Sequence, residues 1–240
     1  MQSISPHLNQ ILFIDLETVP QYPSYQQLPE EWQQLWGKKA EALLKSREEE
    51  TTESIYTRAG IYAEFGKIVC ISCGLIQGYG DTKKLVLKSF FNENEKDLLT
   101  EFLEMLQKWT EPNKFLCAHN GKEFDYPYLC RRMLIQGLEL PTVLQIAGKK
   151  PWDIPHLDTM ELWKFGDFKS YTSLHLLANA LGIPTPKDDI DGSQVAEVYW
   201  KEKNLERIAT YCQKDVLTTA QIYLRMKGED QLLPDQVIYR

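Results

Sequence analysis

The sequence predicts an α/β fold in which a mixed central sheet is flanked by helices. Three segments with the apolar pattern of strands precede the first long amphipathic helix, and the C-terminal half is mostly helical. Of the 240 residues, 43% are hydrophobic and 25% are charged, as is typical of a globular protein. A unit of this length buries roughly 70–75% of its surface on folding, so it needs no disulfide for stability. We expect one domain over residues 1–228, with a helical insertion at residues 18–65 and a tail at residues 229–240.

Four segments have the composition of β-strands. Residues 10–17 (QILFIDLE) form an apolar run that ends in two acidic residues, which is typical of a buried central strand. Residues 67–76 and 84–91 are strand-like and have two glycines in the connection between them, which predicts an antiparallel hairpin. Residues 114–118 (KFLCA) are the fourth predicted strand.

Helical periodicity accounts for most of the remaining chain. Residues 95–109 repeat apolar side chains on one helical face. A second helix is expected at residues 123–136, where Gly137 ends it. Further helices are expected at residues 156–165, 171–181 and 204–226. The insertion contains three prolines and then Trp and Leu residues at helical spacing, which predicts one or two helices.

The charge balance restricts the class of protein. There are 27 Lys and Arg residues against 34 Asp and Glu residues, which gives a formal charge of −7. A protein that coats nucleic acid over a broad surface normally carries the opposite sign. The balance remains compatible with an enzyme that holds a few phosphates through divalent metal.

Neither a membrane span nor a disulfide framework is expected. The chain contains no run of 18 apolar residues and no signal-peptide pattern at its start, so we expect a cytoplasmic protein without membrane contact. Its five cysteines are scattered and odd in number, which favours reduced thiols. Cys70 and Cys73 resemble a metal-binding pair, but on a strand they would point to opposite faces, so we assign them a structural role.

The first candidate for chemistry is the acidic pair at the end of the first strand. Asp15 and Glu17 are two positions apart, so both carboxylates project from one face while Leu16 projects from the other. Two acids at this position are costly unless a cation lies between them. Taken alone, the pair also fits a strand end that becomes polar as it leaves the core.

The second candidate follows the fourth strand, from Asn120 to Asp125 (NGKEFD). Gly121 permits the positive φ of a sharp turn, and Asp125 then lies in the first turn of the next helix. Taken alone, Asn120 and Asp125 also fit the role of helix-capping residues.

The third candidate is Tyr211-x-x-x-Asp215 on the long final helix. Positions i and i+4 share a helical face, and Asp215 lies near the inward side of this helix. An unpartnered carboxylate is unusual there. The alternative is a salt bridge at the rim with Lys214 or Arg207.

Together the three clusters resemble the motifs of the DEDD superfamily of 3′–5′ exonucleases, tyrosine subclass. The D-x-E strand, the N-x-x-x-F-D turn and the helical Y-x-x-x-D occur in the family's order, and the resemblance extends from Ile11 to about Met226. The intervening segments are most similar to bacterial predicted exonucleases related to the proofreading domain of family B DNA polymerases. The resemblance implies a ribonuclease H-like fold and phosphodiester hydrolysis with two metal ions.

The resemblance also implies roles for the five residues. Asp15 would bridge both ions, and Glu17, Asp125 and Asp215 would complete their coordination. Close carboxylates repel by roughly 3 kcal/mol per pair at an effective dielectric near 20, and divalent cations remove this repulsion. Mg²⁺ or Mn²⁺ suits a set of oxygen ligands. Tyr211 would orient the attacking water, because a phenol with a pKa near 10 is a poor base at neutral pH.

Substrate contacts are expected around the same three motifs. The resemblance implies that the backbone of Thr18 and Val19 lies against the terminal nucleotide. Asn120 and Phe124 could line the same pocket, although Phe124 fits ordinary helix packing equally well. Weaker candidates for phosphate contact, which also fit a solvated surface, are Lys149, Lys150, Lys164, Lys169 and Tyr171. We expect Asp158 and Thr159 to cap the helix that follows them.

The expected function is metal-dependent 3′–5′ hydrolysis of single-stranded nucleic acid to nucleoside 5′-monophosphates. DNA is the expected substrate. An oligoribonuclease-like or RNA-processing enzyme is the alternative within the enzyme class, because the sequence does not show how the 2′-hydroxyl is treated. A non-catalytic nucleic-acid binding module is the alternative outside it. The intact set of four acids and Tyr211 argues against that alternative. No protein partner can be inferred.

Overall fold

A computed structural model describes residues 6–47, 49–109, 113–167, 171–185 and 190–240. Within these residues a six-stranded mixed sheet has the strand order β5-β4-β1-β2-β3-β6. Its strands are β1 (Ile11–Pro20), β2 (Gly66–Gln77), β3 (Lys84–Phe91), β4 (Phe115–Ala118), β5 (Leu157–Asp158) and β6 (Val237–Tyr239). The β1–β2 and β2–β3 pairs are antiparallel, and the other pairs are parallel. The predicted α/β fold with a mixed sheet is therefore confirmed.

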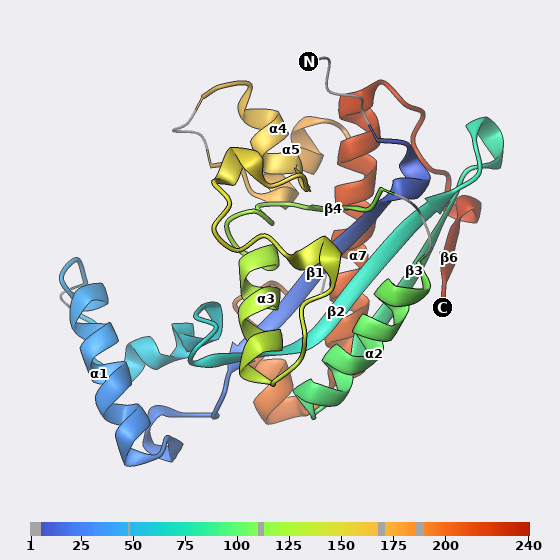
Figure 1. Ribbon diagram of the computed structural model, residues 1–240. Coiled ribbons are helices and arrows are strands. Elements are labelled where there is room, and N and C mark those ends of the chain that lie inside the picture. Colours follow the sequence, from blue (N-terminus) through green and yellow to red (C-terminus); the bar gives the residue numbers. More distant parts are fainter. Residues whose placement is uncertain (1–5, 48, 110–112, 168–170, 186–189) are drawn as a thin grey trace.

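Helices cover both faces of this sheet (Figure 1). One face packs against α2 (Glu95–Lys108) and α3 (Asp125–Ile135), and the other packs against α7 (Leu205–Lys227). Shorter helices complete the chain: α4 (Thr159–Lys164), α5 (Leu174–Ala180), α6 (Val195–Glu197) and the π-helix η7 (Val198–Glu202). Single 3₁₀ turns are Leu8–Gln10, Tyr25–Gln27, Gly80–Thr82, Thr142–Leu144, Pro151–Asp153 and Pro234–Gln236. No helix in the described part of the chain is long and apolar enough to cross a membrane.

The side chains of β1 alternate between two separate cores. Leu12, Ile14 and Leu16 belong to the core under α2 and α3. Ile11 and Phe13 pack in the core under α7, and Val19 packs against the first turns of the same helix. This period of two places Asp15 and Glu17 on the α7 face of the sheet.

The five cysteines are reduced and buried. Cys73 lies in the core under α2 and α3, whereas Cys70 lies in the cluster under α7. The two thiols therefore point to opposite faces of β2, as the strand period predicts.

The insertion contains α1 (Glu30–Leu44) and a 3₁₀ helix, η3 (Ser54–Ile61), and it projects from the end of β1 (Figure 1). It has a small aromatic core of its own around Trp36, whose ring contacts Tyr56, Tyr62 and Phe65. The first three residues assigned to the insertion belong instead to β1, which continues to Pro20 past a bulge between Glu17 and Thr18.

Two further boundaries differ from the predicted ones. The segment expected as a helix at residues 156–165 begins with the short strand β5, and α4 starts at Thr159. The residues expected as a tail contain β6, which pairs with β3. Strands of two or three residues carry too little periodicity to be distinguished from loops in a sequence.

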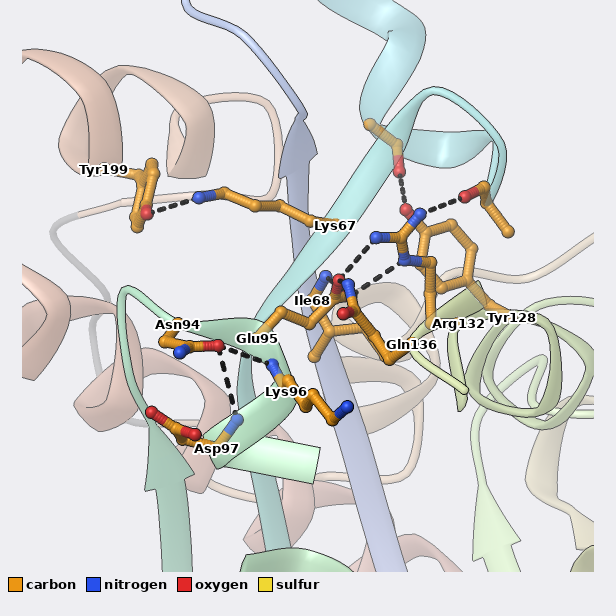
Figure 2. Close-up of polar contacts among 12 residues, drawn as sticks. Lys67, Ile68, Asn94, Glu95, Lys96, Asp97, Tyr128, Arg132, Gln136 and Tyr199 are labelled. Carbon is orange, nitrogen blue, oxygen red and sulfur yellow. Dashed lines mark hydrogen bonds and ion pairs between the residues drawn. The ribbon is translucent and has the colours of Figure 1, made fainter. Parts of the chain in front are cut away.

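A buried polar network joins α2, α3, β2 and the insertion (Figure 2). Glu95 forms an ion pair with Arg132, and it also accepts hydrogen bonds from the Gln136 side chain (2.6 Å) and the Ile68 N–H (2.7 Å). Both charged side chains are nearly inaccessible to solvent. Arg132 also donates to the carbonyl of Ala63 at 2.7 Å, so the guanidinium fixes the insertion to α3.

Candidate active site

Asp15 and Glu17 lie at the centre of the sheet rather than at its rim. Asp15 is opposite Ser72 and Glu17 is opposite Cys70 in the antiparallel pairing with β2. Glu17 is only 7% exposed, and Asp15 is half-buried. The alternative of a polar strand end leaving the core therefore does not apply to Glu17, because β1 continues as a buried strand beyond it.

Cys212 of α7 lies against this acidic pair. Its Sγ is 3.2 Å from Asp15 Oδ2 and 3.4 Å from the Asp15 carbonyl oxygen. Within the described residues, Asp15, Glu17 and Cys212 each offer a ligand atom, and these atoms lie within 4.8 Å of one another. Cys212 is not among the site residues predicted from the sequence. Its position three residues before Asp215 was the available signal, because positions i and i+3 share a helical face.

Asp125 is the first residue of α3 and is 4% exposed. Its carboxylate accepts a hydrogen bond from the backbone N–H of Leu16, the residue between the two acids of β1, and it interacts electrostatically with Asp15. Asp125 is therefore not a solvent-exposed helix cap. Its side chain belongs to the same acidic group.

The turn before Asp125 differs from the predicted one. Asn120 adopts the left-handed conformation (φ 64°), and Gly121 does not. Gly121 is needed for space instead, because a Cβ there would be 2.5 Å from the Cβ of Ala118. Asp158 accepts hydrogen bonds from the N–H groups of Asn120 and Lys122, both at 3.0 Å, and it caps α4 as predicted. One buried carboxylate thus fixes the turn that presents Asp125.

Tyr211 and Asp215 lie one turn apart on α7, and their side chains are hydrogen-bonded to each other. Burial, followed by the charges of Asp215, Glu17 and Asp15, raises the pKa of Tyr211 above its usual value. The phenol therefore stays protonated at neutral pH. Asp215 in turn interacts electrostatically with Glu17, which brings the fourth acid to the group.

The carboxyl groups of Asp15, Glu17 and Asp125 are harder to ionise than free carboxyl groups. Burial raises the pKa of Asp15 to about 6, and it raises the pKa of Glu17 and of Asp125 well above their usual values, with further increases from the neighbouring carboxylates. Among the described residues, no Lys or Arg forms an ion pair with Asp15, Glu17 or Asp125. Buried carboxylates without a protein cation fit a hard divalent metal ion, which takes oxygen ligands.

The other predicted site residues differ in their burial and in their contacts. Thr18 is half-buried and hydrogen-bonds to Tyr128, whereas the side chain of Val19 is fully buried, so only its backbone could reach a ligand. The side-chain oxygen of Asn120 is buried without a hydrogen-bond partner. Phe124 packs against the Tyr128 ring at 5.2 Å, consistent with a helix-packing role.

The weaker phosphate candidates that the structure describes are mostly exposed. Tyr171 is 71% exposed, and Lys149 and Lys150 lie on the surface. Lys164 is in the last turn of α4. Lys169 lies outside the described residues.

A mixed sheet in this strand order with helices on both faces is the arrangement of a ribonuclease H-like fold. Residues 61–236 match the family described as predicted 3′–5′ exonucleases related to the exonuclease domain of PolB, and the chain belongs to this family. The matched segment contains Asp125, Tyr211 and Asp215, whereas Asp15 and Glu17 precede it.

Two DNA polymerases are similar to this chain. A DNA polymerase of Pyrococcus glycovorans is 24% identical over 142 residues, which covers 54% of this chain and 18% of the polymerase. The solved structure of the family B DNA polymerase from the hyperthermophilic archaeon Pyrobaculum calidifontis superimposes with a TM-score of 0.51 and 15% identity. That superposition covers 93% of this chain and 25% of the polymerase. The chain thus spans a small part of each polymerase, and the structural likeness shows the fold.

Proposed function

We propose that this protein is a metal-dependent 3′–5′ exonuclease that degrades single-stranded nucleic acid to nucleoside 5′-monophosphates. DNA is the proposed substrate. The observation that carries the proposal is the acidic group of Asp15 and Glu17 from β1 and Asp125 from α3, with Asp215 of α7 beside it. Among the described residues, no Lys or Arg forms an ion pair with the first three. Membership of the exonuclease family supports the same reaction.

Asp15, Glu17, Asp125 and Asp215 would hold two Mg²⁺ or Mn²⁺ ions. The bound ions would neutralise the carboxylates, acidify the attacking water and stabilise charge on the departing 3′ oxygen. Within the described residues, Cys212 offers a soft ligand atom beside these oxygens. Without metal its pKa is raised well above the usual value, first by burial, so the thiol is neutral there. A set dominated by carboxylate oxygens suits Mg²⁺ or Mn²⁺.

Tyr211 would orient the attacking water rather than remove its proton. Burial raises the pKa of the phenol above its usual value in the metal-free protein, which favours the protonated form, and the hydroxyl interacts with Asp215. Thr18 and the backbone at Val19 lie just past the acids on β1, where they would contact the terminal nucleotide.

Digestion of a 5′-labelled single strand with Mn²⁺ or Mg²⁺ tests the proposal. The parent should shorten the strand from its 3′ end, and a blocked 3′ end or EDTA should prevent this. Asp15→Ala and Asp215→Asn should abolish the activity while the folded structure persists. Tyr211→Phe should reduce kcat by roughly 10–1000-fold, with little change in metal affinity.

Two outcomes would refute the mechanism. Equal digestion by the parent and by Asp15→Ala would show that the acidic group is not the catalytic site. A changed metal affinity with an unchanged kcat in Tyr211→Phe would refute the water-orienting role. Parallel digestion of matched DNA and RNA strands decides between a DNA exonuclease and an RNA-processing enzyme.

A further inference from the structure

A cation and two aromatic rings meet at the end of β1, beyond the acidic residues. Lys67 of β2 is the register partner of Val19 on β1. Its Nζ is 2.7 Å from the Tyr199 hydroxyl, and it lies 4.6 Å and 5.0 Å from the ring centroids of Tyr199 and Trp200. We call these three residues the Lys67 cluster. Figure 2 shows Lys67 reaching toward Tyr199, away from the Glu95–Arg132 network.

The Lys67 cluster is joined directly to the strand that carries the acids. The indole N–H of Trp200 donates to the carbonyl of Pro20 at 3.2 Å. Val19, Tyr199, Trp200, Tyr211 and Cys212 belong to one packed group on the α7 face of the sheet. From Glu17 to Pro20 the strand advances about 10 Å, so the Lys67 cluster lies near the acids.

The charge of Lys67 is not neutralised. Among the described residues it has no carboxylate partner, since its contacts are a phenol oxygen and two ring faces. Ring faces attract a cation but carry no net charge. Lys201, on the same π-helix, is instead paired with Glu197. Lys67 and the Trp200 ring are both half-buried, so solvent and ligands can reach them.

We infer that the Lys67 cluster is a subsite for single-stranded nucleic acid, in which Lys67 contacts a phosphate and Trp200 carries a base. This inference rests on the proposed function for the position of the scissile bond. A protein with a formal charge of −7 needs local cations to hold a phosphodiester strand near buried acids. A half-exposed indole beside such a cation is the usual platform for an unpaired base.

The π-helix η7 explains how the cluster is built. A π-helical turn is wider than an α-turn and occurs often at functional sites. Here it spans Val198–Glu202 and ends at Lys203, which adopts the left-handed conformation (φ 53°). The wide turn presents Tyr199 and Trp200 to Lys67 and Pro20, with the two rings in edge-to-face contact at 4.8 Å.

The test measures binding of a 5′-fluorescein-labelled oligothymidylate by anisotropy in the Asp15→Ala background, at several salt concentrations. Lys67→Met should weaken binding about tenfold, because a charge-assisted phosphate contact is lost. It should also lower the slope of log affinity against log salt by about 0.7, the value for one phosphate on a single strand. Lys67→Arg should keep the parent slope.

Trp200→Leu tests the contribution of base stacking to binding separately from that of the phosphate contact. It should weaken binding about tenfold without changing the salt slope, and Trp200→Phe should restore most of the affinity. In the active protein, Lys67→Met should raise KM about tenfold and leave kcat within about twofold. Lys88→Met is the matched control, because Lys88 on β3 lies 4.5 Å from the Phe90 ring centroid and two strands from β1.

The outcomes distinguish this subsite from the nuclease function. If the parent degrades strands but Lys67→Met binds with parental affinity and slope, the subsite is wrong and the exonuclease stands. If no metal supports degradation but the binding and its salt dependence behave as described, the subsite stands and the exonuclease fails. Failure of the Asp15→Ala protein to bind the oligonucleotide would overturn the subsite.

Discussion

Glu95 and the acids of β1 are both buried carboxylates, but their surroundings differ. Glu95 has a guanidinium partner, a side-chain amide and a backbone N–H. Asp15, Glu17 and Asp125 have one another, a thiol, the backbone N–H of Leu16 and, among the described residues, no cation. The same fold therefore neutralises one buried acid completely and leaves a group of acids unneutralised. The contrast is between a carboxylate that stabilises the fold and the carboxylates for which we propose a metal-binding role.

The largest expected effect is in the neutralised region. Arg132→Met should lower the free energy of unfolding by about 3–5 kcal/mol, because it leaves Glu95 buried without a partner. The carbonyl of Ala63 also loses its donor. Urea denaturation followed by circular dichroism measures this loss.

A double variant sharpens the first prediction. Adding Glu95→Leu to Arg132→Met removes the orphaned charge and should recover part of the lost stability. If the double variant is less stable than Arg132→Met alone, the charge of Glu95 is not the cause of the loss.

The second expected effect is an increase in the free energy of unfolding, caused by a substitution in the acidic group. Glu17→Gln should stabilise the metal-free protein at pH 8 by up to about 3 kcal/mol, the repulsion of one close carboxylate at a dielectric near 20. Burial and neighbouring acids raise the pKa of Glu17 in the folded state, so the folded protein holds its proton more tightly than the unfolded chain does. The cost of ionising Glu17 therefore develops as pH rises above about 4.3, the pKa in the unfolded chain.

Unfolding in EDTA at pH 4 and pH 8 checks this prediction. The gain from Glu17→Gln should be large at pH 8 and nearly absent at pH 4. Glu95→Gln is the matched control, since the same substitution in the neutralised region removes the partner of Arg132 and should destabilise the protein. Destabilisation by Glu17→Gln at pH 8 would contradict the electrostatic account of the acidic group.

The third effect is the response to divalent cations. Mn²⁺ or Mg²⁺ at 100 times its Kd should stabilise the parent by about 2.7 kcal/mol, because a ligand that binds only the folded state shifts unfolding by mass action. Thermal unfolding with either metal or with EDTA measures the shift. Arg132→Met should keep this response and Asp15→Ala should lose most of it. An equal shift in Asp15→Ala would show that the ions bind elsewhere.

The sequence was sufficient for features that depend on local periodicity. The period of two in β1 placed Asp15 and Glu17 on one face and Leu16 on the other, and the helical period brought Tyr211 and Asp215 together. The same rule placed Cys70 and Cys73 on opposite faces of β2.

Features that depend on contacts between distant segments were not predictable in this way. Gly121 was expected to supply the left-handed turn, but Asn120 adopts it. Gly121 is needed for a different reason, because Ala118 leaves no space for a Cβ at that position. Cys212 meets Asp15 across 197 positions, and Glu95 meets Arg132 across 37. The wide turn of η7 is absent from the expected elements because sequence periodicity assumes α-helical spacing.

The insertion is hydrogen-bonded to α3, the helix that carries one of the acids. The Tyr128 hydroxyl donates to the carbonyl of Gly60 at 2.7 Å, and Arg132 donates to the carbonyl of Ala63. Two residues of α3 therefore bind the base of the insertion. Asp125 begins that same helix. Movement of the insertion about residues 60–63 would break these hydrogen bonds of buried groups on the helix that begins with Asp125. We therefore expect the base of the insertion to keep a fixed orientation relative to α3.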